Sequence, residues 1–190
     1  ESVPDMEYRE QNPLGRAEWI KFIAAFYNRE LLADSLFSAI EQRYLGLKAL
    51  AATAKQQPTV FCNLPFKEIW YMPCGENYMA QLIQDAGGNF LWKDVNATNG
   101  LNLNLDYEAV YNKAANADFW LNTGFAASRN DIRTADKKNT LFKAFKTDNI
   151  YNYNKRNTPA GSFDFWESGA VRPDDILADL ITILHPGLLN

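Results

Sequence analysis

Hydrophobic residues in the first third of the chain recur every three or four positions. Residues 14–28 (LGRAEWIKFIAAFYN) follow this spacing and stop at Asn28, and residues 29–55 repeat it over a longer run. The apolar stripe of the longer run consists of Leu32, Leu36, Phe37, Ile40, Tyr44, Leu47 and Leu50. We predict two consecutive helices. At ~1.5 Å per residue the second reaches roughly 40 Å, a length that suits a connection between two bodies.

Beyond Pro58 short apolar runs alternate with amphipathic ones. We predict strands at residues 58–66, 68–73, 89–93, 117–124 and 149–154. Helices are expected at 75–88, 105–117, 136–147 and 171–186, with an Asn- and Gly-rich irregular segment at 95–104. This alternation predicts an α/β fold, a Rossmann-like lobe whose mainly parallel sheet is flanked by helices and preceded by the long helix.

Composition narrows the class of protein. The 190 residues are 47% hydrophobic and 22% charged, with a net charge of -4, as in globular domains. Since the densest basic run, Lys137 and Lys138, is flanked by Asp136, we expect no nucleic-acid partner. No apolar run is long enough to span a bilayer. The first residues, ESVPDMEYREQNP, lack the features of a signal peptide and resemble an interior piece of a longer precursor.

Two cysteines, Cys62 and Cys74, lie on either side of a predicted hairpin between residues 58–66 and 68–73. A two-residue loop would turn the two side chains to opposite faces, whereas a three-residue loop would place them directly across from each other. The sequence leaves both arrangements open, and only the second permits a disulfide.

The usual motifs of catalysis and nucleotide binding are not found. Gly87 and Gly88 follow a predicted helix, so they end it and do not cradle a phosphate. His185 adjoins Pro186 at the end of the last helix, where a capping role is ordinary. With one histidine and no CxxC pair, we expect no zinc site. Asp164 and Glu167 could form an acid/base pair, but such pairs also arise by accident.

The segment GSFDFWESGAVRPDD at residues 161–175 places three large rings just before the last helix. Connecting loops rarely need so much aromatic surface, so one interpretation is a recognition surface. The alternative is that Phe163 and Phe165 point inward from a short strand and fill the core. The sequence alone supports both interpretations.

Five segments, in their order along the chain, resemble the substrate-binding proteins of ABC importers for iron-siderophores, haem and cobalamin. These segments are PLGRAEWIKF, YLGLKALAATAK, WYMPCGENYMAQLIQDAGGNF, LDYEAVYNKAANADFWLNTG and FWESGAVRPDDILADLITILHP. The resemblance implies two α/β lobes joined by one helix. Residues 1–28 would end the first lobe, 29–56 would form the connecting helix, and 57–190 would form the C-terminal lobe. The first lobe, an export signal and a lipid anchor would lie upstream, in a periplasmic or cell-surface protein.

The same resemblance implies the site. The cleft would be lined from this lobe by Tyr78, Asp164, Phe165, Trp166 and Glu167, although a core position is the alternative for Tyr78. The ligand would be an iron chelate or tetrapyrrole, and no cofactor or bound metal is implied. Members that bind cobalamin carry an aromatic ring in the loop that corresponds to residues 96–100, and this loop has none. A more hydrophilic ligand such as a siderophore is therefore favoured.

Glu108 corresponds to an exposed glutamate with which the family docks on arginines of the membrane permease. An acid in the first turn of a helix is also favoured by the helix dipole, which is the alternative explanation. Two other functions stay open: a lobe of an α/β enzyme whose catalytic residues lie in a missing N-terminal half, and an interaction module built on the long helix. An isolated lobe would expose a helix face, so a dimer of the fragment is expected in either case.

Overall fold

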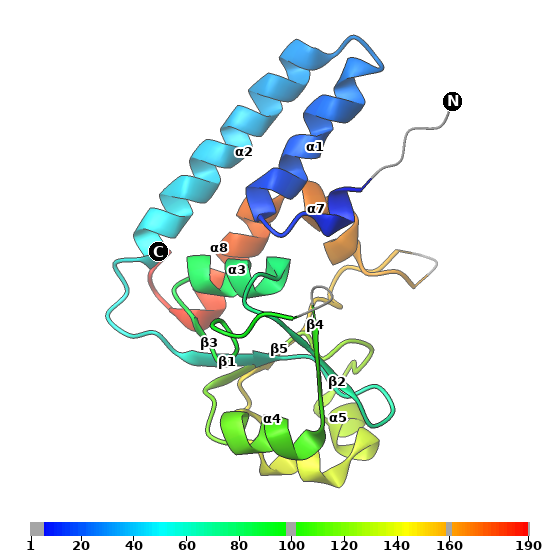
Figure 1. Ribbon diagram of the computed structural model, residues 1–190. Coiled ribbons are helices and arrows are strands. Elements are labelled where there is room, and N and C mark those ends of the chain that lie inside the picture. The colour runs from blue at the N-terminus through cyan, green and yellow to red at the C-terminus, as the bar shows by residue number, and fades with distance from the viewer. Residues whose placement is uncertain (1–5, 98–101, 159–160, 190) are drawn as a thin grey trace.

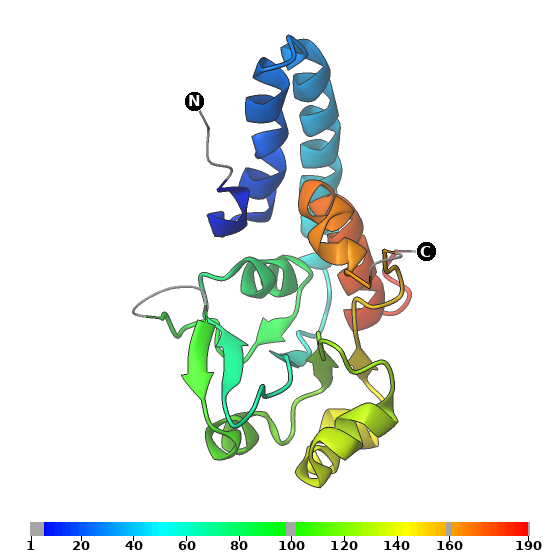
Figure 2. The same cartoon turned by 90° about the vertical axis from the view of Figure 1, so that its right-hand side faces the viewer.

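The computed structural model describes residues 6–97, 102–158 and 161–189. Two long antiparallel helices, α1 (Pro13–Ala25) and α2 (Glu30–Ala51), project from an α/β body, as two perpendicular views show (Figures 1 and 2). Asn12 caps α1, because its side chain accepts hydrogen bonds from the backbone N–H groups of Leu14 and Gly15. The two helices predicted for this part of the chain are confirmed.

The body contains a four-stranded parallel sheet in the order β3-β1-β5-β6. Its strands are β1 (Thr59–Cys62), β3 (Asn89–Phe90), β5 (Phe119–Leu121) and β6 (Ile150–Tyr151). Helices lie on both sides of this sheet in Figure 1. The predicted α/β fold with a parallel, helix-flanked sheet is therefore confirmed.

The predicted hairpin between residues 58–66 and 68–73 forms only at its tip, where Phe66 and Ile69 pair across a two-residue turn, and the strands themselves do not pair. β1 uses both of its edges for β3 and β5, so β2 (Trp70–Pro73) pairs instead with β4 (Asn102–Leu105) in a separate antiparallel ribbon. β4 also lies at the end of the segment expected to be irregular. Cys62 and Cys74 are both buried and form no disulfide, and complete burial raises the pKa of Cys62. The turn at residues 67–68 has two residues, which is the alternative that permits no disulfide.

The remaining helices differ in how well the sequence predicted them. They are α3 (Tyr78–Asp85), α4 (Tyr107–Ala114), α5 (Arg129–Ala135), α6 (Lys143–Lys146), α7 (Ser168–Val171) and α8 (Pro173–Leu184), with 3-10 turns η1 (Glu7–Arg9), η2 (Lys137–Leu141) and η3 (Asp164–Trp166). The short helix α5 was not predicted, although Ser128 and Asp131 form a capping box at its start. The single helix expected at 136–147 is broken at Phe142, which is extended and completely buried.

Aromatic side chains fill the interior between the sheet and the β2–β4 ribbon. Phe61 stacks on Trp120 and Phe142 at ring-centroid distances of 4.8 and 5.0 Å, and Trp70 lies against the same cluster. Such offset and tilted ring contacts are favourable beyond the apolar area that they bury. This cluster holds the carboxyl ends of β1 and β5 and the ribbon in fixed positions.

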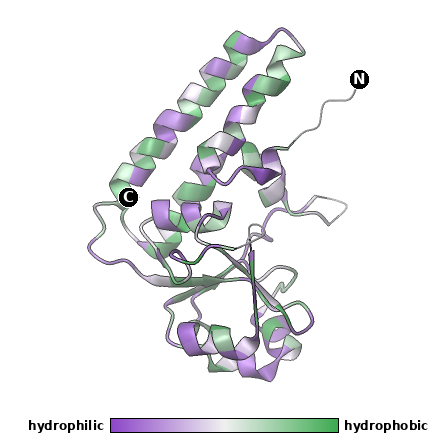
Figure 3. Ribbon diagram, viewed as in Figure 1, coloured by the Kyte–Doolittle hydropathy of each residue, from purple (hydrophilic) through white to green (hydrophobic). Residues whose placement is uncertain are grey.

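Polar contacts fix the C-terminal half of α2 to the body. The Tyr44 hydroxyl donates to the Asp85 carboxylate at 2.6 Å, and Lys48 forms an ion pair with the same carboxylate at 2.8 Å. The part of α1 and α2 near the turn between them is less covered by the body. Hydrophobic positions recur along both helices in Figure 3, and several are exposed there: Phe22, Phe26, Tyr27, Leu31, Leu32 and Leu36.

Across the residues described, no helix combines the length and the apolar character that crossing a membrane requires.

Candidate ligand-binding site

A cavity of about 790 Å³ opens at the carboxyl edge of the parallel sheet. Residues that come just after three of the strands line it: Asn63 directly after β1, Asn122 directly after β5 and Tyr153 two residues after β6. The β2–β4 ribbon adds Tyr71 and Asn102. Ligands of open α/β sheets bind at this edge, because the loops that follow the strands diverge there. The volume lies within the range of small-molecule sites.

Two asparagines at this edge were missed by the sequence analysis. Asn63 and Asn122 have positive φ angles of 66° and 59°, a conformation that asparagine tolerates better than most residues. The Asn63 carbonyl accepts a hydrogen bond from the Trp120 indole N–H at 2.7 Å, and its side-chain amide donates to the Tyr71 carbonyl at 2.6 Å. The signal that could have identified them is an asparagine directly after each buried apolar run.

Aromatic rings form one wall of the cavity. Phe125 is 90% exposed and Trp166 is 46% exposed, and both line the cavity together with Tyr153. Tyr153 stacks on Phe165 at 4.8 Å and meets Phe163 edge to face at 5.0 Å. The segment that the sequence singled out therefore adopts a 3-10 turn instead of the short strand. Trp166 faces the cavity, whereas Phe163 and Phe165 support the wall from behind.

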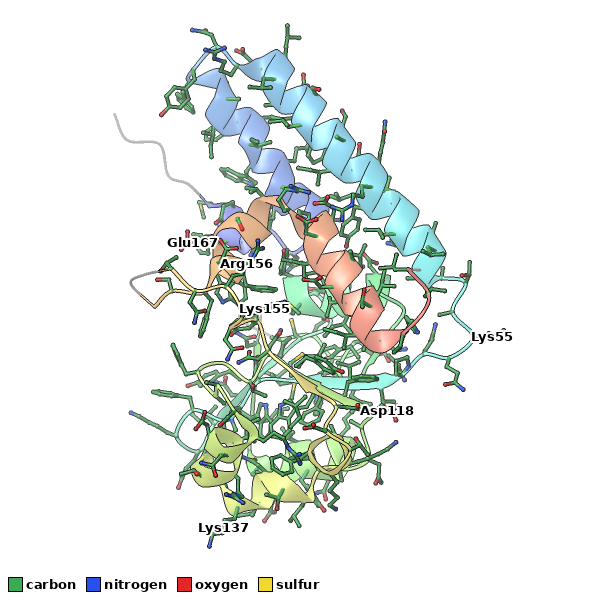
Figure 4. The ribbon with its side chains drawn as sticks, turned by 180° about the vertical axis from the view of Figure 1, so that it is seen from behind. Lys55, Asp118, Lys137, Lys155, Arg156 and Glu167 are labelled. Carbon is green, nitrogen blue, oxygen red and sulfur yellow. The ribbon has the colours of Figure 1, made fainter. Side chains whose placement is uncertain are left out.

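The acidic residues predicted for the site take other positions. The Asp164 carboxylate accepts a hydrogen bond from the Ser168 hydroxyl at 2.7 Å and pairs with Arg156 at 3.2 Å. Glu167 is exposed between η3 and α7, and it is labelled in Figure 4. Of the five residues predicted for the cleft, Tyr78 and Trp166 line the cavity, and Asp164, Phe165 and Glu167 do not.

Tyr78 and Arg16 also line the cavity. Tyr78 begins α3, and its ring carries the Arg16 guanidinium at 4.2 Å from the ring centroid. The sequence analysis missed Arg16, which lies in the PLGRAEWIKF segment but gave no separate signal. Burial raises the pKa of Tyr78 to about 12, and the positive charge of Arg16 acts in the opposite direction. The phenol therefore stays protonated near neutral pH and can donate a hydrogen bond.

The other candidate residues lie outside the cavity. Glu108 is exposed in the first turn of α4 and forms no ion pair with any residue the structure describes. His185 ends α8, where its backbone N–H donates to the Ile181 carbonyl. Across residues 6–97, 102–158 and 161–189, no group of three or more His, Cys, Asp and Glu side chains could hold a metal ion. From the described residues, the cavity thus offers rings, amides, the Arg16 guanidinium and the Asp131 carboxylate, a set suited to binding a small organic molecule.

The chain is similar in sequence and in fold to known proteins. The sequence pattern of the family described as periplasmic binding protein matches residues 1–156. An uncharacterized lipoprotein of Methanocaldococcus jannaschii is 33% identical over 187 residues, which are 97% of this chain and 42% of that protein. The chain spans about half the length of the curated relatives that it matches, at 42%, 52% and 46%.

Two solved structures have the same fold at low sequence identity. One is a Staphylococcus aureus protein in complex with haem, with a TM-score of 0.66 and 17% identity over 94% of this chain and 67% of that one. The other belongs to an ABC-type Fe3+-hydroxamate transport system of Saccharomonospora viridis, with a TM-score of 0.68 and 14% identity over 92% of this chain and 56% of that one.

Proposed function

The chain belongs to the periplasmic binding protein family, and on that premise we propose that it is the substrate-binding component of an ABC-type uptake system. Its ligand would be an iron-siderophore, haem or a related chelate, held in the cavity at the carboxyl edge and delivered to a membrane permease. The observation that carries this proposal is the aromatic wall of Phe125, Tyr153 and Trp166. Flat chelates and macrocycles present apolar faces on which such rings can stack.

We propose that this lobe forms half of a two-lobed cleft, with α2 as the connection. The curated relatives are about twice as long as this chain, which leaves room for a second lobe. The second lobe could pack against the exposed apolar side chains of α1 and α2 near the turn between the two helices. In isolation, the same surface would favour a dimer of this chain. Sedimentation of the isolated chain, compared with the two-lobed protein, tests this.

The place of action and the partner follow from the same premise. Because relatives of this chain are named lipoproteins, we propose a lipid-anchored protein at the cell surface or in the periplasm. Glu108, exposed in the first turn of α4, is the residue proposed to dock on arginines of the permease. Exposed charge pairs of this kind are screened by salt, so docking should weaken as ionic strength rises.

An enzymatic role is the alternative, and Tyr78 is its best candidate because its pKa is raised and it faces the cavity. A general base or acid works best when its pKa lies near the working pH. A pKa of about 12 moves the phenol away from that range, so it suits hydrogen bonding better than proton transfer. We therefore propose a non-catalytic role.

Ligand titration of the chain joined to its first lobe tests the proposal. Haem, a ferric siderophore and cobalamin are added separately while tryptophan fluorescence is followed. A bound chelate should quench Trp166, and Trp166→Phe should remove most of the quenching and weaken binding. Trp19→Phe is the matched control, since Trp19 is partly buried on α1 and does not line the cavity. If none of the three ligands binds, the proposed function is wrong.

A further inference from the structure

Residues 129–146 carry an excess of positive charge. This segment, which contains α5, η2 and α6, has six lysine and arginine residues and two aspartates, whereas the whole chain has a net charge of -4. All six cations are exposed, and we call them the basic surface: Arg129, Arg133, Lys137, Lys138, Lys143 and Lys146. Because its charge is opposite in sign to that of the chain as a whole, its partner is expected to be an anion.

The basic surface lies at the end of the molecule away from the turn between α1 and α2, where Figure 4 shows Lys137. Both α5 and α6 pack against η2. Two hollows of about 560 and 330 Å³ open on this surface, and Arg133 lines both of them. The other residues that line them are Arg129, Asn130, Thr134, Lys137, Thr140 and Phe145. No carboxylate of a described residue lines either hollow, so an anion that enters meets cations without competition.

Half of the basic surface has no acidic partner. Three of its cations form ion pairs at distances between 2.6 and 3.8 Å: Arg129 with Asp148, Lys138 with Asp136, and Lys143 with Asp118. Within the described chain, no ion pair joins Arg133, Lys137 or Lys146 to a carboxylate, and the Arg133 guanidinium donates to the neutral side chain of Asn130 at 2.6 Å. These three charges are available to a partner.

The residue proposed to dock on the permease lies beside the basic surface. The Tyr107 hydroxyl donates to the Lys138 carbonyl at 2.7 Å, and the Lys138 ammonium lies 4.9 Å from the centroid of the Tyr107 ring. Glu108 directly follows Tyr107 in the first turn of α4. Arginines that attract Glu108 would repel the basic surface, so its partner is a different anion. A permease lies in a bilayer, and a face that turns Glu108 toward it brings the neighbouring cations close to the lipid headgroups.

We propose that the basic surface binds the phosphate groups of anionic membrane lipids. Guanidinium and ammonium groups form charge-assisted hydrogen bonds with phosphate oxygens. This inference rests on the lipid anchor given under the proposed function, which keeps the protein near a bilayer. A single lipid chain holds a protein only marginally, and a basic surface supplies the second attraction that stable attachment needs.

Co-sedimentation with vesicles tests this proposal on the full-length protein prepared without an attached lipid. One set of vesicles consists of phosphatidylcholine, which has no net charge, and the other also contains the anionic lipid phosphatidylglycerol. The protein should bind only the anionic vesicles, and binding should weaken as the salt concentration rises, because lipid charge is screened within a Debye length.

A triple variant, Arg133→Gln with Lys137→Gln and Lys146→Gln, removes the cations that have no ion pair. Each cation close to an anionic bilayer strengthens binding by about fivefold. The triple variant should therefore bind the anionic vesicles about 100-fold more weakly than the wild type. Circular dichroism checks that it is folded.

The matched control combines Arg9→Gln, Arg29→Gln and Lys55→Gln, which change the net charge equally at exposed positions outside the basic surface. It should bind anionic vesicles as the wild type does. Equal losses in the two triple variants, or a wild-type protein that does not prefer anionic vesicles, would overturn the proposal. Binding that requires the permease in the vesicles would show that the surface recognises protein, and the proposal would also be wrong.

Failure here is distinguishable from failure of the proposed function. Arg133, Lys137 and Lys146 do not line the cavity at the carboxyl edge of the sheet, so their replacement should leave chelate binding unchanged. Loss of vesicle binding alone refutes the lipid-binding surface and leaves the proposed ligand standing. A protein that binds anionic vesicles but none of the chelates refutes the proposed function and keeps the surface.

Discussion

Replacement of Asp174 by Asn tests how the long helix α2 is held on the body. The Asp174 side chain is 2% exposed at the start of α8. Its carboxylate pairs with Arg43 of α2 at 2.6 Å and with Arg172 through two contacts of 3.1 Å. Asp175 pairs with the same two arginines from a half-exposed position. The variant keeps the shape of Asp174 and removes its charge.

The expected loss of stability lies between two limits. Removing one partner of a fully buried ion pair costs roughly 3 to 5 kcal/mol, whereas an exposed pair contributes up to about 1 kcal/mol. Here the carboxylate is buried and both arginines are about half exposed. We therefore expect Asp174→Asn to lower the free energy of unfolding by about 2 kcal/mol at neutral pH.

The effect should depend on pH in one direction. Burial alone would raise the pKa of Asp174, but hydrogen bonds from Arg172 and Arg43 hold it below its ordinary value. A carboxylate with a lowered pKa in the folded state stabilises the protein above its unfolded pKa of about 3.9. That contribution disappears as the pH falls through the folded value. The difference between wild type and Asp174→Asn should therefore shrink as the pH falls below about 4.

Urea denaturation followed by circular dichroism at neutral and acidic pH measures this difference. Asp175→Asn is the matched control, because it removes a neighbouring carboxylate that is half exposed. Its cost should stay below about 1 kcal/mol. Equal costs for the two variants, or a cost of Asp174→Asn that does not change with pH, would refute the reasoning.

Two further predictions concern the turn before α3 and the docking surface. Gly75→Ala should lower the free energy of unfolding by about 2 kcal/mol or more, because the added Cβ would overlap the backbone carbonyl of Lys93. Gly46→Ala is the control, since Gly46 has open space around it. Equal stability of the two variants would contradict the predicted overlap at Gly75. Glu108→Lys should lower transport in cells and leave chelate affinity unchanged, and unaltered transport would remove the proposed docking role.

The sequence alone predicted the elements whose signals are local. Periodicity located α1 and α2, and alternation of short apolar and amphipathic runs predicted the parallel, helix-flanked sheet. Gly87 has a positive φ of 78° and ends α3, as its place in the sequence indicated. The aromatic segment before α8 was selected by its composition alone, and one of its rings, Trp166, lines the cavity.

Strand partners were decided by the tertiary structure. Hydrophobic alternation specifies a strand but not its neighbour, so β2 could be assigned to β1 until the parallel pairing of β1 with β3 and β5 left no free edge. The sequence pattern also could not say which of three neighbouring residues in one turn would line the cavity. Asp164, Phe165 and Trp166 all lie in the same 3-10 turn, and of the three only Trp166 lines the cavity.

The candidate site is the part of the protein that depends most on the tertiary structure. Arg16 and Tyr78 lie far apart in the sequence, and each alone resembles an ordinary helical residue. Only the packing of α1 against α3 places the guanidinium over the ring at the wall of a cavity. Side-chain chemistry and local periodicity are encoded residue by residue, whereas a binding site depends on distances between elements, and those are set by how the whole chain packs.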